Sequence, residues 1–204
     1  MIIILNNVIS IYNFFCNLIP LKLLFKNKFI VLVGFMGAGK TSLGRGLSKK
    51  LNLPHIDTDY EIEKIKKMKI SNIFEFYGEN YFRELEQDTI INIISKNKSS
   101  IISLGGGSFL NIKLREYIKN KCISIWINVN IDIIYKRINN SQNIRPIFSK
   151  MKSKRDLEIL LNKRNLIYKE ADIKIDSGKL NKSRLVEKVL HKINKYLENN
   201  NENC

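Results

Sequence analysis

The sequence predicts an α/β protein with a five-stranded parallel sheet that is covered by helices on both faces. Short apolar runs rich in Ile and Val alternate along the chain with longer segments of helical periodicity, which is the pattern of a parallel sheet with crossover helices. A glycine-rich loop follows the first of these runs and opens a helical segment. The chain of 204 residues is long enough for one domain with a substantial core.

Five apolar segments are the expected strands. FIVLVG, from Phe29, is apolar throughout, as is typical of a strand buried on both faces. The second strand is PHID, from Pro54. The remaining three are expected at IISL from Ile101, SIWINV from Ser124 and ADIKID from Ala171.

Helical segments are expected between these strands. Leu43, Leu47 and Leu51 recur every four residues after the glycine-rich loop. A charged helix is expected near residues 60–69. The following segment, NIFEFYGENYFRELEQDTIINII, is predicted as a helix that is interrupted near Gly78.

Two terminal segments flank an expected catalytic domain of residues 28–196. Residues 1–27 are strongly apolar and contain no acidic residue, but asparagines and Pro20 interrupt them, and neither the basic start nor the cleavage site of a secretory signal is present. A targeting segment, a membrane anchor, an added helix and a start assigned too far upstream all stay open for them. Residues 197–204, LENNNENC, are predicted to form a polar tail.

Composition limits the partners and the compartment. The net charge of +16 favours small anionic ligands, but the lysines are spread along the chain without a compact basic run, so we expect neither nucleic acid nor a membrane as a partner. The three cysteines are far apart and form no CxxC pair. This arrangement argues against a disulfide framework or a zinc site and is typical of a reducing compartment. We therefore expect a cytoplasmic monomer, with organellar targeting by the N-terminal segment as the alternative.

The glycine-rich loop is the strongest motif of the chain. Residues 34–41, GFMGAGKT, fit GxxxxGK[ST] and lie between an expected strand and an expected helix. In such a loop successive backbone N–H groups surround the phosphates, the lysine reaches the β- and γ-phosphates, and the hydroxyl binds Mg²⁺. The sequence therefore predicts binding of ATP or GTP with Mg²⁺. The expected nucleotide-binding residues are Gly37, Ala38, Gly39, Lys40, Thr41 and Ser42.

Two carboxylates are expected beside the phosphates. Asp57 and Asp59 follow the second expected strand, at the sheet edge where open α/β sheets bind ligands. Alternation along an extended segment would point both side chains to the same side. Asp57 is then expected to face Mg²⁺ together with Thr41, and Asp59 to face an acceptor hydroxyl as its orienter or general base. The alternative is that the two acids only cap a helix.

A second group of residues suggests an acceptor site. Arg83 and Glu86 are one helical turn apart, so Glu86 could hold the arginine for a substrate carboxylate, or the two could form an ordinary surface ion pair. Residues 105–107 are three consecutive glycines, which is costly unless the backbone must turn unusually or approach another group closely.

These pieces together resemble the shikimate kinase family, within the nucleoside-monophosphate-kinase-like P-loop proteins. The resemblance runs from about Phe29 to Asp176 and is carried by several motifs in order. They are GFMGAGKTSLGRGL, DTD, the run IxxIFxxxGExxFRxxE from Ile70 to Glu86, LGGG, Arg145-Pro146 and Arg164-x-x-x-Tyr168. It implies a three-layer P-loop kinase fold with a mobile lid, and ATP as co-substrate.

The resemblance also implies roles for particular residues. Asp59 is the base for the 3-hydroxyl of shikimate, and Arg83 and Arg164 bind the shikimate carboxylate. Gly105, Gly106 and Gly107 let the backbone lie against the acceptor, so Gly106→Val is expected to raise the acceptor KM or abolish activity while sparing ATP binding.

The lid contributes two further expectations. Arg145 closes over the phosphates as a catalytic residue with Lys40, unless it is an ordinary loop arginine. Arg137 is expected to stack on adenine. The DSGK stretch at residues 176–179 is expected on the adenine side, without the family's usual proline.

The sequence thus predicts an enzyme that transfers the γ-phosphoryl of ATP to the 3-hydroxyl of shikimate, in aromatic amino-acid synthesis. The alternatives are a related small-molecule kinase, such as a gluconate kinase, and a nucleotide-binding module without chemistry. The Arg83 and Arg164 pair with the glycines favours a rigid ring that carries a carboxylate.

Overall fold

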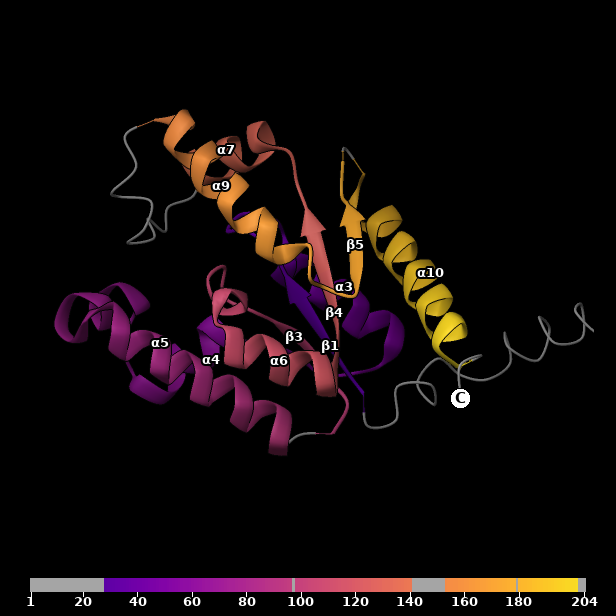
Figure 1. Cartoon of the computed structure of the whole chain (residues 1–204), viewed down its shortest axis with the longest axis horizontal. Coiled ribbons are helices and arrows are strands. Elements are labelled where there is room, and N and C mark those ends of the chain that lie inside the picture. The colour runs from indigo at the N-terminus through magenta and orange to yellow at the C-terminus, as the bar shows by residue number, and fades with distance from the viewer. Residues whose placement is uncertain (1–27, 97, 141–152, 179, 202–204) are drawn as a thin grey trace, which may run out of the picture.

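A five-stranded, wholly parallel sheet forms the centre of the protein (Figure 1). The computed structural model describes residues 28–96, 98–140, 153–178 and 180–201. The strand order is β2-β3-β1-β4-β5, and every neighbouring pair is parallel. The bounds are β1 Phe29–Val33, β2 His55–Asp57, β3 Ile101–Ser103, β4 Cys122–Asn128 and β5 Ile173–Asp176. All five predicted strands are thereby confirmed.

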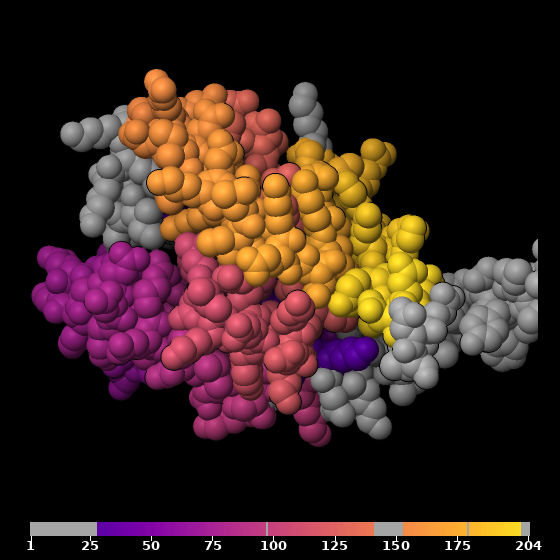
Figure 2. All heavy atoms as spheres, viewed as in Figure 1, coloured from indigo at the N-terminus to yellow at the C-terminus, as the bar shows by residue number. Residues whose placement is uncertain are grey.

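Helices cover both faces of this sheet (Figure 1). Helix α3 (Lys40–Leu51) packs against β3 on one face and against α10 (Lys182–Asn201). Helix α6 (Ile112–Lys121) packs on β4 from the other face, where it fills the surface between α5 (Ile70–Lys96) and α9 (Lys154–Tyr168) (Figure 2). The remaining elements are α4 (Thr58–Lys66), the 3₁₀ helix η1 (Ser108–Leu110) and α7 (Ile131–Asn139).

The main core lies on both faces of the sheet, and β1 is buried along its whole length. A smaller apolar cluster of Ile62, Ile73 and Phe82 lies apart from it, between α4 and α5. The predicted interruption of α5 is confirmed at Gly78, whose φ of 81° and ψ of 172° are not helical. Helix α5 therefore consists of two helical segments, and the segment that carries Arg83 begins directly after Gly78.

The C-terminal boundary differs from the prediction. Helix α10 continues to Asn201, and Leu197 is only 4% exposed. Val189, Ile193 and Leu197 recur every four residues on its buried side, so the apolar face holds the helix past residue 196 despite the asparagines. The prediction of a polar tail from residue 197 was therefore wrong for residues 197–201, which belong to α10. Residues 1–27 lie outside the described part of the chain, and no helix in the described part is long and apolar enough to span a bilayer.

Candidate active site

The loop of residues 34–41 joins β1 to α3 in a conformation that requires glycine. Gly34, Gly37 and Gly39 have φ values of 143°, 73° and 94°, a region that other residues rarely adopt. Gly39 is the N-cap of α3 and no side chain caps the helix there. The first N–H groups and the positive end of the helix dipole therefore face the loop, as expected for a phosphate site.

Lys40 lies inside this loop. Its Nζ donates hydrogen bonds of 2.8 Å to the Gly34 carbonyl and 3.0 Å to the Phe35 carbonyl. The side chain is buried, so it is already at the bottom of the phosphate loop.

Thr41 and Asp57, the expected Mg²⁺ ligands, are in contact. The Thr41 hydroxyl donates a 2.6 Å hydrogen bond to Asp57 Oδ2. Asp57 Oδ1 accepts a 3.2 Å bond from the Asp59 N–H, so Asp57 is also the N-cap of α4. The prediction that Asp57 and Asp59 share a side by strand alternation was wrong in its reason, because helix α4 begins at Thr58. Both side chains nevertheless face the same cavity.

The oxygen donors at this point fit Mg²⁺. Mg²⁺ usually takes one or two protein oxygens and completes its shell with phosphate oxygens and water, and the Thr41 hydroxyl and Asp57 carboxylate supply two such oxygens. Over the described residues, no group of three or more His, Cys, Asp or Glu side chains could hold a metal by itself. Thr41 and Asp57 are thus suited to a metal that arrives with the nucleotide.

A cavity of about 520 Å³ opens over the phosphate loop. Arg137 borders it and donates a 2.8 Å hydrogen bond to the Gly37 carbonyl. Residues 177–178 of the DSGK stretch also line it, but Leu180, Lys182 and Leu185 were not predicted from the sequence. The complete lining is Gly37, Ala38, Gly39, Lys40, Thr41, Ser42, Leu43, Asp57, Asp59, Leu104, Arg137, Ser177, Gly178, Leu180, Lys182 and Leu185.

The three consecutive glycines are explained by close approach, because none of them has a positive φ. A Cβ on Gly105 would stand 2.5 Å from Glu86 Oε1 and 2.7 Å from Asp59 Oδ1. On Gly107 it would stand 2.6 Å from Arg83 Nη1. The backbone therefore lies directly against the side chains that were expected to bind the acceptor.

Gly106 has a different neighbour. A Cβ there would stand 3.2 Å from the backbone nitrogen of Met36, in the phosphate loop. The triple glycine thus passes between the phosphate loop on one side and the acceptor side chains on the other. A substituent at Gly106 would press on the donor loop, so the expectation that Gly106→Val spares ATP binding does not fit this geometry.

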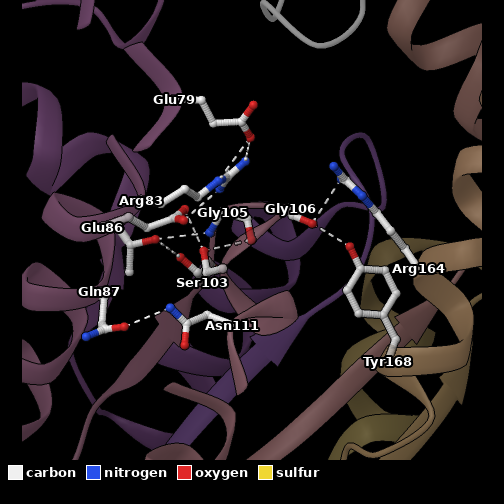
Figure 3. Close-up of polar contacts among 12 residues, drawn as sticks. Glu79, Arg83, Glu86, Gln87, Ser103, Gly105, Gly106, Asn111, Arg164 and Tyr168 are labelled. Carbon is white, nitrogen blue, oxygen red and sulfur yellow. Dashed lines mark hydrogen bonds and ion pairs between the residues drawn. The ribbon is translucent and has the colours of Figure 1, made fainter. Parts of the chain in front are cut away.

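Arg83 and Glu86 form a partly buried ion pair beside the glycines (Figure 3). Arg83 Nη1 donates a 2.7 Å bond to Glu86 Oε2, and the Nε and Nη2 groups bond to Glu79. Burial raises the pKa of the Glu86 carboxyl above its ordinary value, against the opposing effect of the Arg83 charge. Glu86 is 2% exposed, so this pair is not the ordinary surface ion pair that the spacing left open.

Arg164 approaches the glycines from the other side (Figure 3). Its Nη1 donates a 3.1 Å bond to the Gly106 carbonyl, and its Cζ lies 5.2 Å from the centre of the Phe35 ring. Tyr168, one turn later on α9, donates its hydroxyl to the same carbonyl. Burial raises the pKa of Tyr168 to about 12, so the phenol stays protonated and keeps donating.

Two residues hold this region without having been predicted. The buried Thr58 hydroxyl donates to the Ser103 carbonyl and accepts from the Gly105 N–H, which ties the start of α4 to the glycine turn. The Ser108 hydroxyl lies 2.6 Å from Glu86 Oε1. Their sequence positions, between Asp57 and Asp59 and directly after the glycines, are the one signal that could have pointed to them.

The structure therefore brings most of the predicted residues into two adjoining sites. The phosphate loop, Asp57 and Arg137 line the cavity, whereas Arg83 and Arg164 lie on opposite sides of the glycine turn beside it (Figure 3). Asp59 belongs to both sites, because it lines the cavity and faces Gly105. Arg145 lies outside the described residues.

Comparison with known proteins identifies a family that covers the residues of both sites. A family model described as shikimate kinase matches residues 36–194. The shikimate kinase of Rhizobium meliloti (strain 1021) is 36% identical over 161 residues, which are 79% of this chain and 83% of that protein. That of Bartonella henselae is 35% identical over 187 residues, or 87% of this chain and 88% of that one.

Solved structures agree with the sequence relatives. The shikimate kinase from Acinetobacter baumannii in complex with shikimate superposes with a TM-score of 0.79 at 30% identity, over 85% of this chain and 97% of that one. A gluconokinase from Sinorhizobium meliloti 1021 has a TM-score of 0.51 at 13% identity, over 85% of this chain and 95% of that one, which shows a shared fold alone. The chain belongs to the shikimate kinase family.

Proposed function

We propose that this protein transfers the γ-phosphoryl group of ATP to the 3-hydroxyl of shikimate, giving shikimate 3-phosphate and ADP in the route to aromatic amino acids. The observation that carries this function is the position of Arg83 and Arg164 at the glycine turn, where Arg83 lies against Gly107, Arg164 against Gly106, and Asp59 against Gly105. Guanidinium groups bind carboxylates well because their planar forks match the two oxygens. A ring with a carboxylate at one end and hydroxyls at the other would place those hydroxyls at Asp59.

The roles of the residues follow from their positions. The Asp59 carboxylate orients the 3-hydroxyl and takes its proton as the oxygen attacks the γ-phosphorus. The bond from that phosphorus to the β–γ bridging oxygen breaks, and ADP leaves. Lys40 and the α3 N-terminus stabilise the charge on the phosphoryl oxygens. Arg145 is proposed to add a further positive charge from the lid, on the basis of the sequence resemblance.

Thr41 and Asp57 would hold Mg²⁺ with the nucleotide. The Thr41 hydroxyl donates its proton to Asp57 at 2.6 Å, which leaves the lone pairs of the hydroxyl oxygen for the metal. When bound, Mg²⁺ supplies positive charge that offsets the phosphate charges. Arg137 and the apolar Leu180 and Leu185 also line the cavity and are suited to the faces of a nucleobase.

Gluconate is the alternative acceptor. Its carbon chain is flexible, so it would lose more conformational entropy than a ring on binding between two fixed arginines. A nucleotide-binding module without chemistry would be expected to lack one of the proposed catalytic residues, and Lys40, Asp59 and Arg145 are all present in the sequence. The spread of the lysines and the separate cysteines support the further proposal of a cytoplasmic monomer without a nucleic-acid partner.

The function is tested by ADP release from MgATP with shikimate, with gluconate and without an acceptor. We expect release that depends on shikimate and falls at least about 100-fold in Asp59→Asn, because the base is lost while the shape is kept. Asp88→Asn removes an exposed carboxylate on α5 and is the matched control. ATP binding without turnover of shikimate would agree with the proposed nucleotide site and refute the proposal that shikimate is the acceptor.

A further inference from the structure

We propose that Ser108 is a positioning residue for acceptor binding: its hydroxyl fixes the Glu86 carboxylate, which in turn fixes the Arg83 guanidinium. The inference rests on the proposed function, in which Arg83 binds the carboxylate of shikimate. Ser108 lies directly after the triple glycine, at the first position of η1. It is not among the residues that line the cavity, so we expect its effect to pass through its neighbours.

The contacts of Ser108 are short and buried. The residue is 1% exposed, and its Oγ lies 2.6 Å from Glu86 Oε1 and 3.0 Å from the Gly105 carbonyl oxygen. A hydroxyl has a single proton, and the ionised carboxylate is the stronger acceptor of the two. Ser108 therefore donates to Glu86 whenever Glu86 is charged.

Glu86 divides its two oxygens between two partners. Oε1 accepts from Ser108 on η1, and Oε2 accepts from Arg83 Nη1 at 2.7 Å on its own helix. A carboxylate held at one oxygen can still rotate, whereas one held at both oxygens has a fixed plane. The plane of Glu86 determines where the Arg83 fork lies against Gly107, at which no Cβ intervenes.

The other partner of Arg83 cannot replace this support. Glu79 bonds to Nε and Nη2 at 3.3 Å and 3.2 Å, but its side chain is 57% exposed. Exposed ion pairs hold their geometry weakly because water competes for both charges. The buried path from Ser108 through Glu86 is therefore the stronger restraint on the guanidinium.

Charged groups around Glu86 give the proposal a second readout. Arg83 faces it from α5, Asp59 from α4, and the Tyr168 hydroxyl and Arg164 lie beyond the glycine turn on α9. Burial and Asp59 raise the pKa of Glu86, while Arg83 and the Ser108 hydroxyl oppose that rise. Removing the hydroxyl should raise this pKa further, so that Glu86 becomes neutral at a higher pH and releases Arg83 there.

The test compares Ser108→Ala with Ser100→Ala. The Ser100 hydroxyl is equally buried and has no hydrogen-bond partner, so its removal controls for loss of a buried serine. We expect Ser108→Ala to raise the KM for shikimate roughly three- to tenfold, with kcat and the KM for ATP changed less than about twofold. The acid limb of kcat/KM for shikimate should move to higher pH. Ser100→Ala should leave all of these at the wild-type values.

Two further variants separate the proposed path from a merely structural effect. Ser108→Thr keeps the hydroxyl and is expected to have a lower KM for shikimate than Ser108→Ala. In a Glu86→Ala background, Ser108→Ala should change that KM less than about twofold, because the path is already cut. An unchanged KM and pH profile in Ser108→Ala, or a full effect without Glu86, would overturn the inference. Wild-type protein that does not phosphorylate shikimate would instead overturn the proposed function.

Discussion

The Thr41 hydroxyl donates a 2.6 Å hydrogen bond to Oδ2 of Asp57, which joins the phosphate loop to the end of β2. The same carboxylate caps α4 through the Asp59 N–H. Asp57 therefore connects the proposed metal site to the helix that carries the proposed base.

Asp57→Asn separates the charge of this residue from its capping role. Asparagine caps helices about as well as aspartate, so we expect the free energy of unfolding to change by less than about 1 kcal/mol. Loss of the negative charge should raise the Mg²⁺ concentration for half-maximal activity by about tenfold or more. A Mg²⁺ titration of the initial rate measures this, and an unchanged midpoint would remove Asp57 from the metal site.

Gly107→Ala should affect the acceptor and spare the donor. Its Cβ would meet the Arg83 guanidinium at 2.6 Å, and the end of this flexible side chain would have to move away. We expect the KM for shikimate to rise about tenfold, with an unchanged KM for ATP. Gly106→Val, which presses on the backbone of Met36, should impair both. Steady-state kinetics with each substrate varied would contradict this if Gly106→Val changed the shikimate KM alone.

Arg164→Lys tests the second arginine. Lysine keeps the charge but lacks the planar fork that contacts the Gly106 carbonyl and can bind a carboxylate at the same time. The shikimate KM should rise about tenfold or more, while nucleotide binding measured by calorimetry stays the same. Arg155→Lys, an exposed position on the same helix, is the control. Equal kinetics in the two variants would show that Arg164 does not bind the acceptor.

Glu86→Gln should weaken acceptor binding and remove a pH-dependent loss of stability. The pKa of Glu86 is raised in the folded protein, so the wild type binds this proton more tightly when folded and loses stability as pH rises above about 4.5. The glutamine variant lacks that loss. Its free energy of unfolding relative to wild type should therefore increase from pH 4.5 to pH 7, by denaturant titration, with Glu84→Gln as an exposed control on the same helix. A relative stability that falls over this range would contradict the raised pKa.

Much of the fold could be predicted from the sequence because local signals agreed with the tertiary structure. The apolar run at β1 and the break at Gly78 are both visible in the letters, and both are found in the structure. The order of the strands was not predicted, because hydrophobic pattern alone does not say which parallel strands are neighbours. The end of α10 was missed because the four asparagines of residues 197–204 outweighed the single apolar Leu197 in the interpretation.

Within the site, spacing predicted which residues take part better than it predicted how they meet. Arg83 and Glu86 lie on one helix, so their contact follows from periodicity. Ser108 and Thr58 act across long sequence separations, on Glu86 and Gly105 respectively, and no local pattern reports such contacts. The glycines were expected to make room for the acceptor, whereas the groups closest to Gly105 and Gly107 are the protein's own side chains, and the group closest to Gly106 is the backbone of Met36.

The most direct test of the account identifies the phosphorylated product. Purified protein would be incubated with MgATP and shikimate, ADP would be quantified, and the new phosphate ester would be assigned by ¹H–³¹P correlation. The account predicts one ADP for each shikimate consumed and a single ester coupled to the proton on carbon 3. A phosphate on another hydroxyl, ADP release that does not depend on shikimate, or equal turnover of gluconate would contradict it.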